Sequence, residues 1–119
     1  MANILAVDDS PSIRQLVAMI LKGGGHTVKL AENGIGALDI AKHYAADLVI
    51  TDVHMPNMDG ITLTSELRGI PEYRYKPILI LTTESSPEFK ARGKAAGATG
   101  WIVKPFDPSA LLSLLDKVL

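Results

Sequence analysis

The sequence predicts an α/β domain in which the strands of a parallel sheet alternate with helices, and three observations support this. Short runs rich in Ile and Val, with few polar residues, are typical of strands covered on both faces. Longer segments between them carry apolar residues at helical spacing. The two patterns alternate five times along 119 residues, a length that fits a single domain spanning residues 1–119. The expected strands are Ile4–Val7, Val28–Leu30, Leu48–Thr51, Ile78–Leu81 and Trp101–Val103.

The segments between the strands carry both the period and the boundaries of helices. The apolar positions at helical spacing are Ile13, Leu16, Val17, Ile20 and Leu21; Ile35, Leu38 and Ala41–Ala45; and Leu111, Leu114, Leu115 and Val118. Ser10, Ser86 and Asp107 each precede a proline, which places a capping residue before a residue suited to the first helical turn. Glycines at 23–25 and at Gly97 stand where helices are expected to end.

Composition excludes several classes of protein. The 12 Lys and Arg residues nearly balance the 13 Asp and Glu residues, which argues against a nucleic-acid or membrane-surface binder. No run approaches the roughly 20 apolar residues of a membrane span, and the first residues lack the basic segment of a secretory signal. Cysteine is absent, so disulfides and thiolate metal sites are excluded. We therefore expect a soluble protein of the cytoplasm, a reducing compartment, with no membrane insertion.

Polar residues stand at the ends of four of the expected strands. Asp8 and Asp9 follow the first strand, Asp52 the third, Thr82 the fourth and Lys104 the fifth. In an open parallel sheet, ligands bind beyond the carboxyl ends of the strands, where the strand order reverses. Each residue alone has a structural explanation, as a helix cap, a turn residue or a surface side chain. Their joint placement predicts that they converge on one edge of the sheet.

The residue types at this edge point to a particular chemistry. Crowded carboxylates repel one another and need a cation or a proton to coexist at neutral pH. Mg²⁺ is favoured over Ca²⁺ because few protein ligands are available and water can complete an octahedron. A carboxylate nucleophile, Asp52, flanked by Mg²⁺ and Lys104 is the arrangement required to form and break an aspartyl phosphate. The cation, the ammonium group and a threonine hydroxyl would neutralise the charge on a phosphoryl group in transfer.

Four segments, in this order and at these spacings, resemble those of the response regulator receiver domain family, in particular its stand-alone, CheY-like chemotaxis type. They are VDDS (residues 7–10), TDVHMPNMDG (51–60), LTTE (81–84) and GWIVKPF (100–106). The resemblance extends from Ile4 to Leu119. It implies a flavodoxin-like (βα)5 three-layer sandwich whose five parallel strands have the order 2-1-3-4-5.

The resemblance implies roles for the acidic residues and for two side chains near them. Asp52 corresponds to the phosphoacceptor of the family. Asp9 and Asp52 would bind Mg²⁺ directly, together with the backbone carbonyl of His54, whereas Asp8 would act mainly through water. The side chains of His54 and Glu84 would tune the rate of dephosphorylation, with no metal ligation by the imidazole.

The resemblance also assigns the residues of the switch. Lys104 would pair with the phosphoryl oxygens, and the peptide that joins it to Pro105 would be cis. Thr82 corresponds to the hydroxyl that approaches the phosphoryl group. Trp101 stands where receivers usually carry a tyrosine or phenylalanine that turns inward on activation, so the larger indole is a departure from the pattern.

The partners are implied by the same resemblance. The upstream donor would be a histidine kinase or a phosphotransfer protein. Without an output domain the chain, expected to be a monomer and not an enzyme, would act by binding another protein, most simply a component of the flagellar motor switch. A phosphate sink or relay intermediate is the alternative. Lys90, Arg92 and Lys94 near Trp101 form either a docking face for an acidic segment or a solvated helix face.

Hypotheses from other classes fit less well. A flavodoxin-like electron carrier would need a hydroxyl- and glycine-rich phosphate loop where Asp8 and Asp9 stand. A phosphatase of the haloacid dehalogenase type would need a second aspartate two residues after its nucleophile, where this chain has His54. A receiver that is never phosphorylated would not need the five polar residues, all of which are present.

Overall fold

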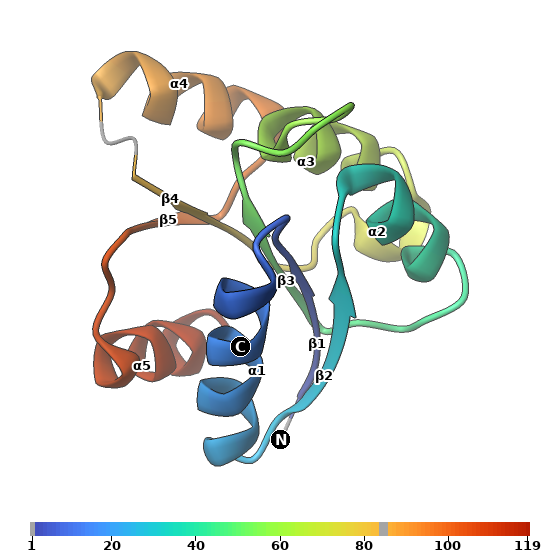
Figure 1. The fold of residues 1–119 in the computed structure, drawn as a ribbon. Coiled ribbons are helices and arrows are strands. Elements are labelled where there is room, and N and C mark those ends of the chain that lie inside the picture. The colour runs from blue at the N-terminus through green and yellow to red at the C-terminus, as the bar shows by residue number, and fades with distance from the viewer. Residues whose placement is uncertain (1, 84–85) are drawn as a thin grey trace.

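The computed structural model describes residues 2–83 and 86–119 of the chain. Within these residues, strands and α-helices alternate along the chain (Figure 1). The strands are β1 (Asn3–Val7), β2 (Thr27–Ala31), β3 (Leu48–Asp52), β4 (Ile78–Thr82) and β5 (Gly100–Val103). The helices are α1 (Pro11–Gly23), α2 (Gly34–Ala41), α3 (Gly60–Arg68), α4 (Pro87–Ala96) and α5 (Pro108–Val118), with a 3-10 turn, η1, at Pro71–Tyr73.

The strands form one parallel sheet with the order β2-β1-β3-β4-β5. This confirms the predicted flavodoxin-like fold and its strand order. Val7 lies opposite Thr51 and Asp52 lies opposite Leu81, so β1, β3 and β4 end almost level with one another. The segments that follow these strands therefore meet at the carboxyl edge of the sheet.

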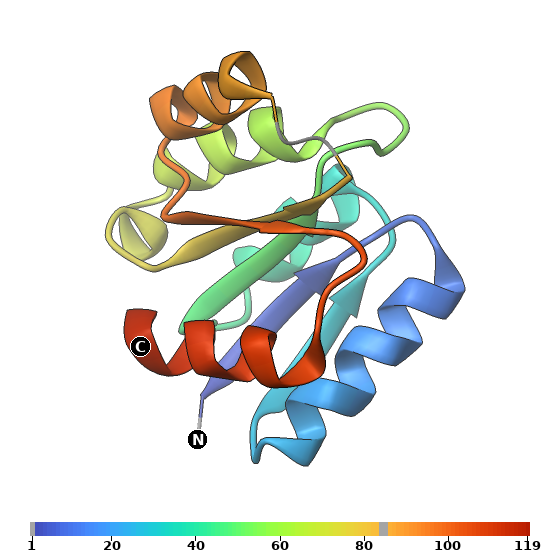
Figure 2. The ribbon, with the colours of Figure 1, turned by 90° about the vertical axis from the view of Figure 1, so that its left-hand side faces the viewer.

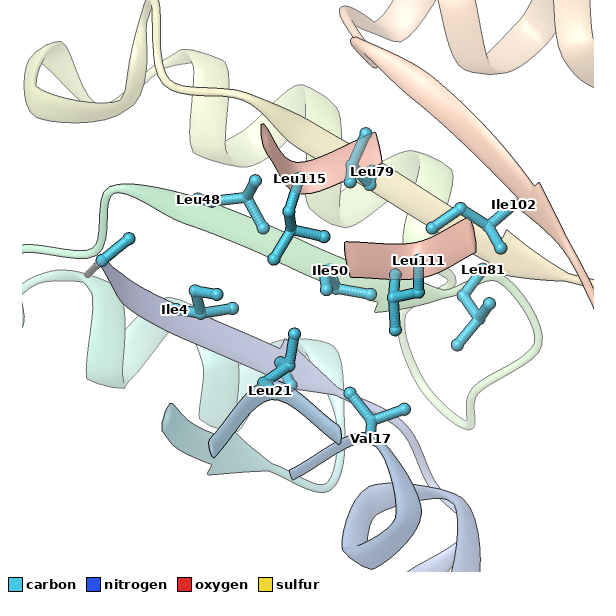
Figure 3. Close-up of a cluster of buried hydrophobic side chains, with 12 residues drawn as sticks. Ile4, Val17, Leu21, Leu48, Ile50, Leu79, Leu81, Ile102, Leu111 and Leu115 are labelled. Atoms are coloured by element: carbon cyan, nitrogen blue, oxygen red, sulfur yellow. The ribbon is translucent and has the colours of Figure 1, made fainter. Parts of the chain in front are cut away.

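Helices cover both faces of the sheet and form the outer layers of a three-layer sandwich. Helices α1 and α5 lie on one face, and α2, α3 and α4 lie on the other (Figures 1 and 2). Under α1 and α5, aliphatic side chains from four strands and both helices pack into one cluster (Figure 3). Its labelled members are Ile4, Val17, Leu21, Leu48, Ile50, Leu79, Leu81, Ile102, Leu111 and Leu115. Separate clusters lie under α2 and α3 and under α4, so strands with apolar side chains on both faces are buried as predicted.

The predicted helix starts are confirmed by their hydrogen bonds. The Ser10 hydroxyl accepts from the N–H of Ile13 (3.4 Å), and the Ser86 hydroxyl accepts from that of Phe89 (3.3 Å). The Asp107 carboxylate accepts from the N–H of residue 110 (3.1 Å). Each satisfies a backbone donor that the helix itself leaves unpaired. Gly97 ends α4 with φ of 106°, a left-handed conformation that glycine adopts without a steric penalty.

One predicted boundary is wrong. The apolar stripe suggested a helix reaching Ala45, but α2 ends at Ala41. The chain must leave the helix early to return to the amino edge of the sheet, where the N–H of Asp47 donates to the carbonyl of Asn3 (2.6 Å) before β3 begins. Across the described ranges, 2–83 and 86–119, we find no helix with the length and apolar character of a membrane span.

Candidate functional site at the carboxyl edge

Three carboxylates meet beyond the ends of β1 and β3. Asp8 and Asp9 directly follow β1, and Asp52 is the last residue of the neighbouring strand β3. One oxygen of each carboxylate lies within 4.8 Å of those of the other two. Asp8 and Asp52 are only 4% and 7% exposed, whereas Asp9 faces solvent. The structure therefore gathers the three aspartates named from the sequence into one partly open acidic cluster.

Lys104 brings an ammonium group to two of these carboxylates. Its Nζ lies 3.3 Å from Oδ2 of Asp8 and 3.2 Å from Oδ1 of Asp52. The backbone N–H of Lys104 donates to the carbonyl of Thr82 (2.8 Å), which fixes where the side chain leaves the sheet. The peptide between Lys104 and Pro105 is cis. Residues from β1, β3, β4 and the end of β5 thus converge as the parallel-sheet rule requires.

The charges of the cluster are not balanced. Burial raises the pKa of the Asp52 carboxyl, and the negative charge of Asp8 raises it further. The charge and hydrogen bond of Lys104, and the N–H of Val53 that donates to Oδ1 (2.9 Å), lower that pKa but do not cancel the increase. Among the described residues, the Lys104 ammonium thus pairs with two buried carboxylates, and Asp9 adds a third, exposed carboxylate to the cluster.

The donor set fits a hard divalent cation. Carboxylate oxygens are the ligands that Mg²⁺ and Ca²⁺ prefer, and Mg²⁺ keeps several waters when a protein offers few ligands. The exposed Asp9 leaves one side of the cluster open to solvent. A cation held there, together with the Lys104 ammonium, would create a binding place for an anionic group beside Asp52.

Backbone contacts hold the acidic residues in place, and sequence reasoning missed two of the residues that make them. A Cβ on Gly60 would lie 2.0 Å from the carbonyl oxygen of Asp52, so only glycine allows α3 to begin this close to β3. The Gly60 N–H also donates to the carbonyl of Val53 (2.9 Å). Arg14 Nη1 donates to the carbonyl of Asp8 (2.7 Å). The Asp-Gly pair before α3 was a usable signal for Gly60, whereas nothing in the local sequence marks Arg14.

The structure describes three of the four predicted switch and rate-tuning residues. Thr82 is buried at the end of β4, and Trp101 is partly buried in β5. His54 is exposed, and its ring centroid lies 5.8 Å from that of Phe89. Among the residues the structure describes, the imidazole of His54 does not join the group of potential metal ligands. Glu84, predicted to tune dephosphorylation, lies outside the described residues.

Comparisons with known proteins agree with this geometry. The model of the response regulator receiver domain family matches residues 4–116. Chemotaxis protein CheY-3 of Vibrio cholerae is 37% identical over 117 residues, which are 98% of this chain and 90% of that protein. Protein PilH of Pseudomonas aeruginosa is 36% identical over 119 residues, covering 100% and 98% of the two chains.

Solved structures share the fold of this chain. The structure of chemotaxis protein CheY4 of Vibrio cholerae has a TM-score of 0.97 and 50% identity, covering 100% of this chain and 99% of that one. The receiver domain of a Pseudomonas aeruginosa sensor histidine kinase has a TM-score of 0.91 and 28% identity, covering 98% and 96%. That domain carries a magnesium ion coordinated in its active site cleft.

Proposed function

Because this chain belongs to the response regulator receiver domain family, we propose that residues 1–119 act as one phosphoacceptor switch whose acceptor is Asp52. The observation that carries the proposal is the position of Asp52. Its carboxylate is buried at the end of β3, 3.2 Å from the ammonium of Lys104 and within the cluster of three carboxylates. A receiver that is not phosphorylated would have no use for this unbalanced cluster.

In the proposed reaction, a carboxylate oxygen of Asp52 attacks the phosphorus of an N-phosphorylated imidazole on a histidine kinase or phosphotransfer protein. The new O–P bond forms as the N–P bond breaks, and the electron pair returns to the donor nitrogen. Mg²⁺ bound by Asp8, Asp9, Asp52 and the carbonyl of His54 would supply positive charge to the phosphoryl oxygens. Lys104 stays protonated and neutralises the same oxygens from the other side. The chain turns over no other substrate in this scheme.

Phosphorylation then acts as a population shift. Thr82, buried at the end of β4, is the hydroxyl expected to approach the phosphoryl group. A change from about 1:99 to 99:1 between inactive and active conformers needs about 5.5 kcal/mol of differential stabilisation. A few charge-assisted hydrogen bonds of about 1.5–3 kcal/mol each are sufficient to supply it.

The direct test is a measurement of intact mass. Wild-type protein incubated with Mg²⁺ and acetyl phosphate should gain the mass of one phosphoryl group, and EDTA should prevent this. Asp52→Asn should gain none, because an amide is a poor nucleophile for phosphorus. Asp47→Asn is the matched control, since Asp47 lies at the opposite edge of the sheet and should leave the gain unchanged. A wild-type protein that is never phosphorylated, even at short times, would refute the proposal.

The downstream target is proposed to be another protein of the cytoplasm, with the chain acting as a monomer. Lys90, Arg92 and Lys94 are exposed on α4, and a cavity of about 320 Å³ lies beside Trp101. Lys90 and Lys94 line this cavity, which suits an acidic segment carrying an apolar side chain. The similarity to two chemotaxis proteins supports a component of the flagellar motor switch as the target.

A phosphate sink or relay intermediate without a motor target is the second candidate. The two candidates differ in what a deletion strain does. Loss of a motor-binding regulator should abolish switching between swimming modes, and the purified phosphoprotein should bind the switch component. Loss of a sink should instead prolong the phosphorylation of a second response regulator, with no direct binding to the motor.

A further inference from the structure

The indole of Trp101 occupies a space that a glycine leaves for it. Gly93 is buried in the middle of α4, directly over β5. A Cβ at this position would lie 2.3 Å from Cζ3 of Trp101 and 3.2 Å from its Cε3. Carbon atoms in favourable contact are about 3.5–4.0 Å apart. Any side chain at Gly93 would therefore displace the indole or the helix, so Gly93 is what lets Trp101 pack under α4.

Two further rings connect this indole to the loop that follows the phosphoacceptor. The ring centroid of Phe89 lies 6.1 Å from that of Trp101, with the rings edge to face at 76°. On its other side, Phe89 lies 5.8 Å from the ring of His54, at 57°. Both distances fall within the range of favourable aromatic pairs. The guanidinium carbon of Arg92 lies 5.3 Å from the centre of the Phe89 ring. This is within cation–π distance, and the interaction helps to hold Phe89 in place.

The three rings therefore form a chain of ring contacts from the phosphoacceptor loop to Trp101. His54 stands two residues after Asp52, and Trp101 lines the cavity together with Lys90 and Lys94. A small movement of the loop at His54 must be accommodated by Phe89, because Phe89 is packed between His54 and Trp101. A movement of Trp101 changes the wall of the cavity.

We propose that Gly93 seats Trp101 in the inward position before any phosphorylation, and that Phe89 is the positioning residue that couples this indole to the phosphoacceptor loop through His54. This inference rests on the proposed function of Asp52. It differs from the pattern that the family resemblance implies, in which the aromatic residue of β5 turns inward only on activation. In this chain the indole is already packed, so phosphorylation acts on its position through the ring path.

The seat, meaning the packing of the Trp101 indole against Gly93, is tested on unphosphorylated protein. Trp101 is the only tryptophan, so acrylamide quenching of its fluorescence reports its exposure. Gly93→Ala should raise the quenching constant by roughly twofold, because the added methyl group displaces the indole toward solvent. Gly23→Ala is the matched control: it adds the same methyl group to the last residue of α1, where a Cβ would meet no atom within 4 Å. A folded Gly93→Ala protein that is quenched like the wild type would overturn the seat.

A failure of Gly93→Ala to fold is also informative. In that event the smaller side chain of a Gly93→Ala, Trp101→Leu double variant should restore folding, because the clash is with the indole itself. A double variant that remains unfolded would show that Gly93 is needed for another reason, and the proposal would be lost.

The coupling is tested at Phe89 on phosphorylated protein. Phe89→Leu should change the half-life of the phosphoryl group on Asp52 by roughly threefold, which is the scale of one lost ring contact. The emission of Trp101 in the wild type should change on phosphorylation, and Phe89→Leu should abolish this change. Phe89→Tyr, which keeps the ring, should retain both the wild-type half-life and the emission change. Tyr75→Leu removes a ring that is 89% exposed and should change neither.

The possible failures are distinguishable. A Phe89→Leu protein with the wild-type half-life and emission change would overturn the coupling while leaving Asp52 as the acceptor. A wild-type protein that gains no phosphoryl mass would instead refute the proposed function, and the quenching of Gly93→Ala would still decide whether the seat exists.

Discussion

The two edges of the sheet differ in how completely the chain itself pairs their buried and partly buried polar groups. At the amino edge, the guanidinium of Arg68 donates to the carbonyls of Gly97, Tyr73 and Lys76 at 3.0 Å or less. The hydroxyl of Tyr73 donates to a backbone carbonyl and accepts from the N–H of Ala46 (3.3 Å). At the carboxyl edge, Asp8 and Asp52 share one ammonium from Lys104, and Asp9 adds a third carboxylate.

This difference suggests that the amino edge contributes to stability, whereas the carboxyl edge serves function. Carbonyl dipoles of the chain itself satisfy the partly buried guanidinium of Arg68 at the amino edge, so that edge is complete without a ligand. At the carboxyl edge, burial and the negative charge of Asp8 raise the pKa of Asp52 by more than Lys104 and the N–H of Val53 lower it. Unfavourable groups of this kind are retained where a ligand completes them. Substitutions at the two edges should therefore shift the free energy of unfolding in different ways.

The largest effect is expected at the amino edge. Arg68→Ala should lower the free energy of unfolding by about 3 kcal/mol, because it leaves several partly buried carbonyls without a donor. Urea unfolding monitored by circular dichroism measures this change. Arg74→Ala removes a guanidinium from an exposed neighbouring position and should cost less than about 0.5 kcal/mol. Equal losses from the two variants would contradict the view that Arg68 stabilises this edge through its hydrogen bonds.

Substitution of one lysine at each edge allows a direct comparison of the two edges. Lys104→Met should lower the free energy of unfolding by about 2 kcal/mol in EDTA, because two buried carboxylates lose the ammonium that lies within 3.3 Å of both. Mg²⁺ should restore much of this loss, since we propose that it is held by the same carboxylates. Lys76→Met removes an exposed ion pair to Asp47 at 3.9 Å and should cost about 0.5 kcal/mol or less, with no response to Mg²⁺. A loss in Lys104→Met that Mg²⁺ does not change would count against the shared site.

Much of the fold and of the site could be predicted because both follow from local patterns and one topological rule. Apolar runs and helical periods mark the elements, and serine or aspartate before proline marks where three helices begin. Once the sheet is parallel, the residues after β1, β3, β4 and β5 must meet at one edge, which brings Asp8, Asp52 and Lys104 together. Their separation along the sequence did not affect this prediction, because the register of the strands fixes where each strand ends at the carboxyl edge.

The features that the sequence did not reveal depend on contacts between distant segments. Arg68 reaches Gly97, 29 residues away, and no local pattern distinguishes it from an exposed arginine at a helix end. Gly93 and Trp101 meet only because α4 lies against β5, and no local pattern marks Gly93 as the residue that leaves room for the indole. The early end of α2 at Ala41 is set by where β3 must begin, and it overrode an apolar stripe that continued to Ala45.

The smallest expected effect is a gain in stability at the acidic cluster. Asp52→Asn should raise the free energy of unfolding by about 1 kcal/mol at pH 7 in EDTA, because it removes one of two buried like charges and keeps the shape of the side chain. The same substitution should abolish phosphorylation. Thermal and urea unfolding of the two proteins under identical conditions measure the difference.

The stability difference between Asp52→Asn and the wild type should also depend on pH. Burial and Asp8 raise the pKa of Asp52 in the folded domain, so the folded state binds this proton more tightly than the unfolded chain. The protonated carboxyl therefore favours folding fully below its unfolded pKa of about 3.9, and this contribution is lost as the pH rises through the folded pKa. Asparagine imitates the uncharged carboxyl at every pH, so its advantage should be greatest at neutral pH and shrink on acidification. An advantage that stays constant from pH 7 to pH 4, or a wild type that is the more stable at pH 7, would mean that the chain already neutralises its carboxyl edge without a ligand.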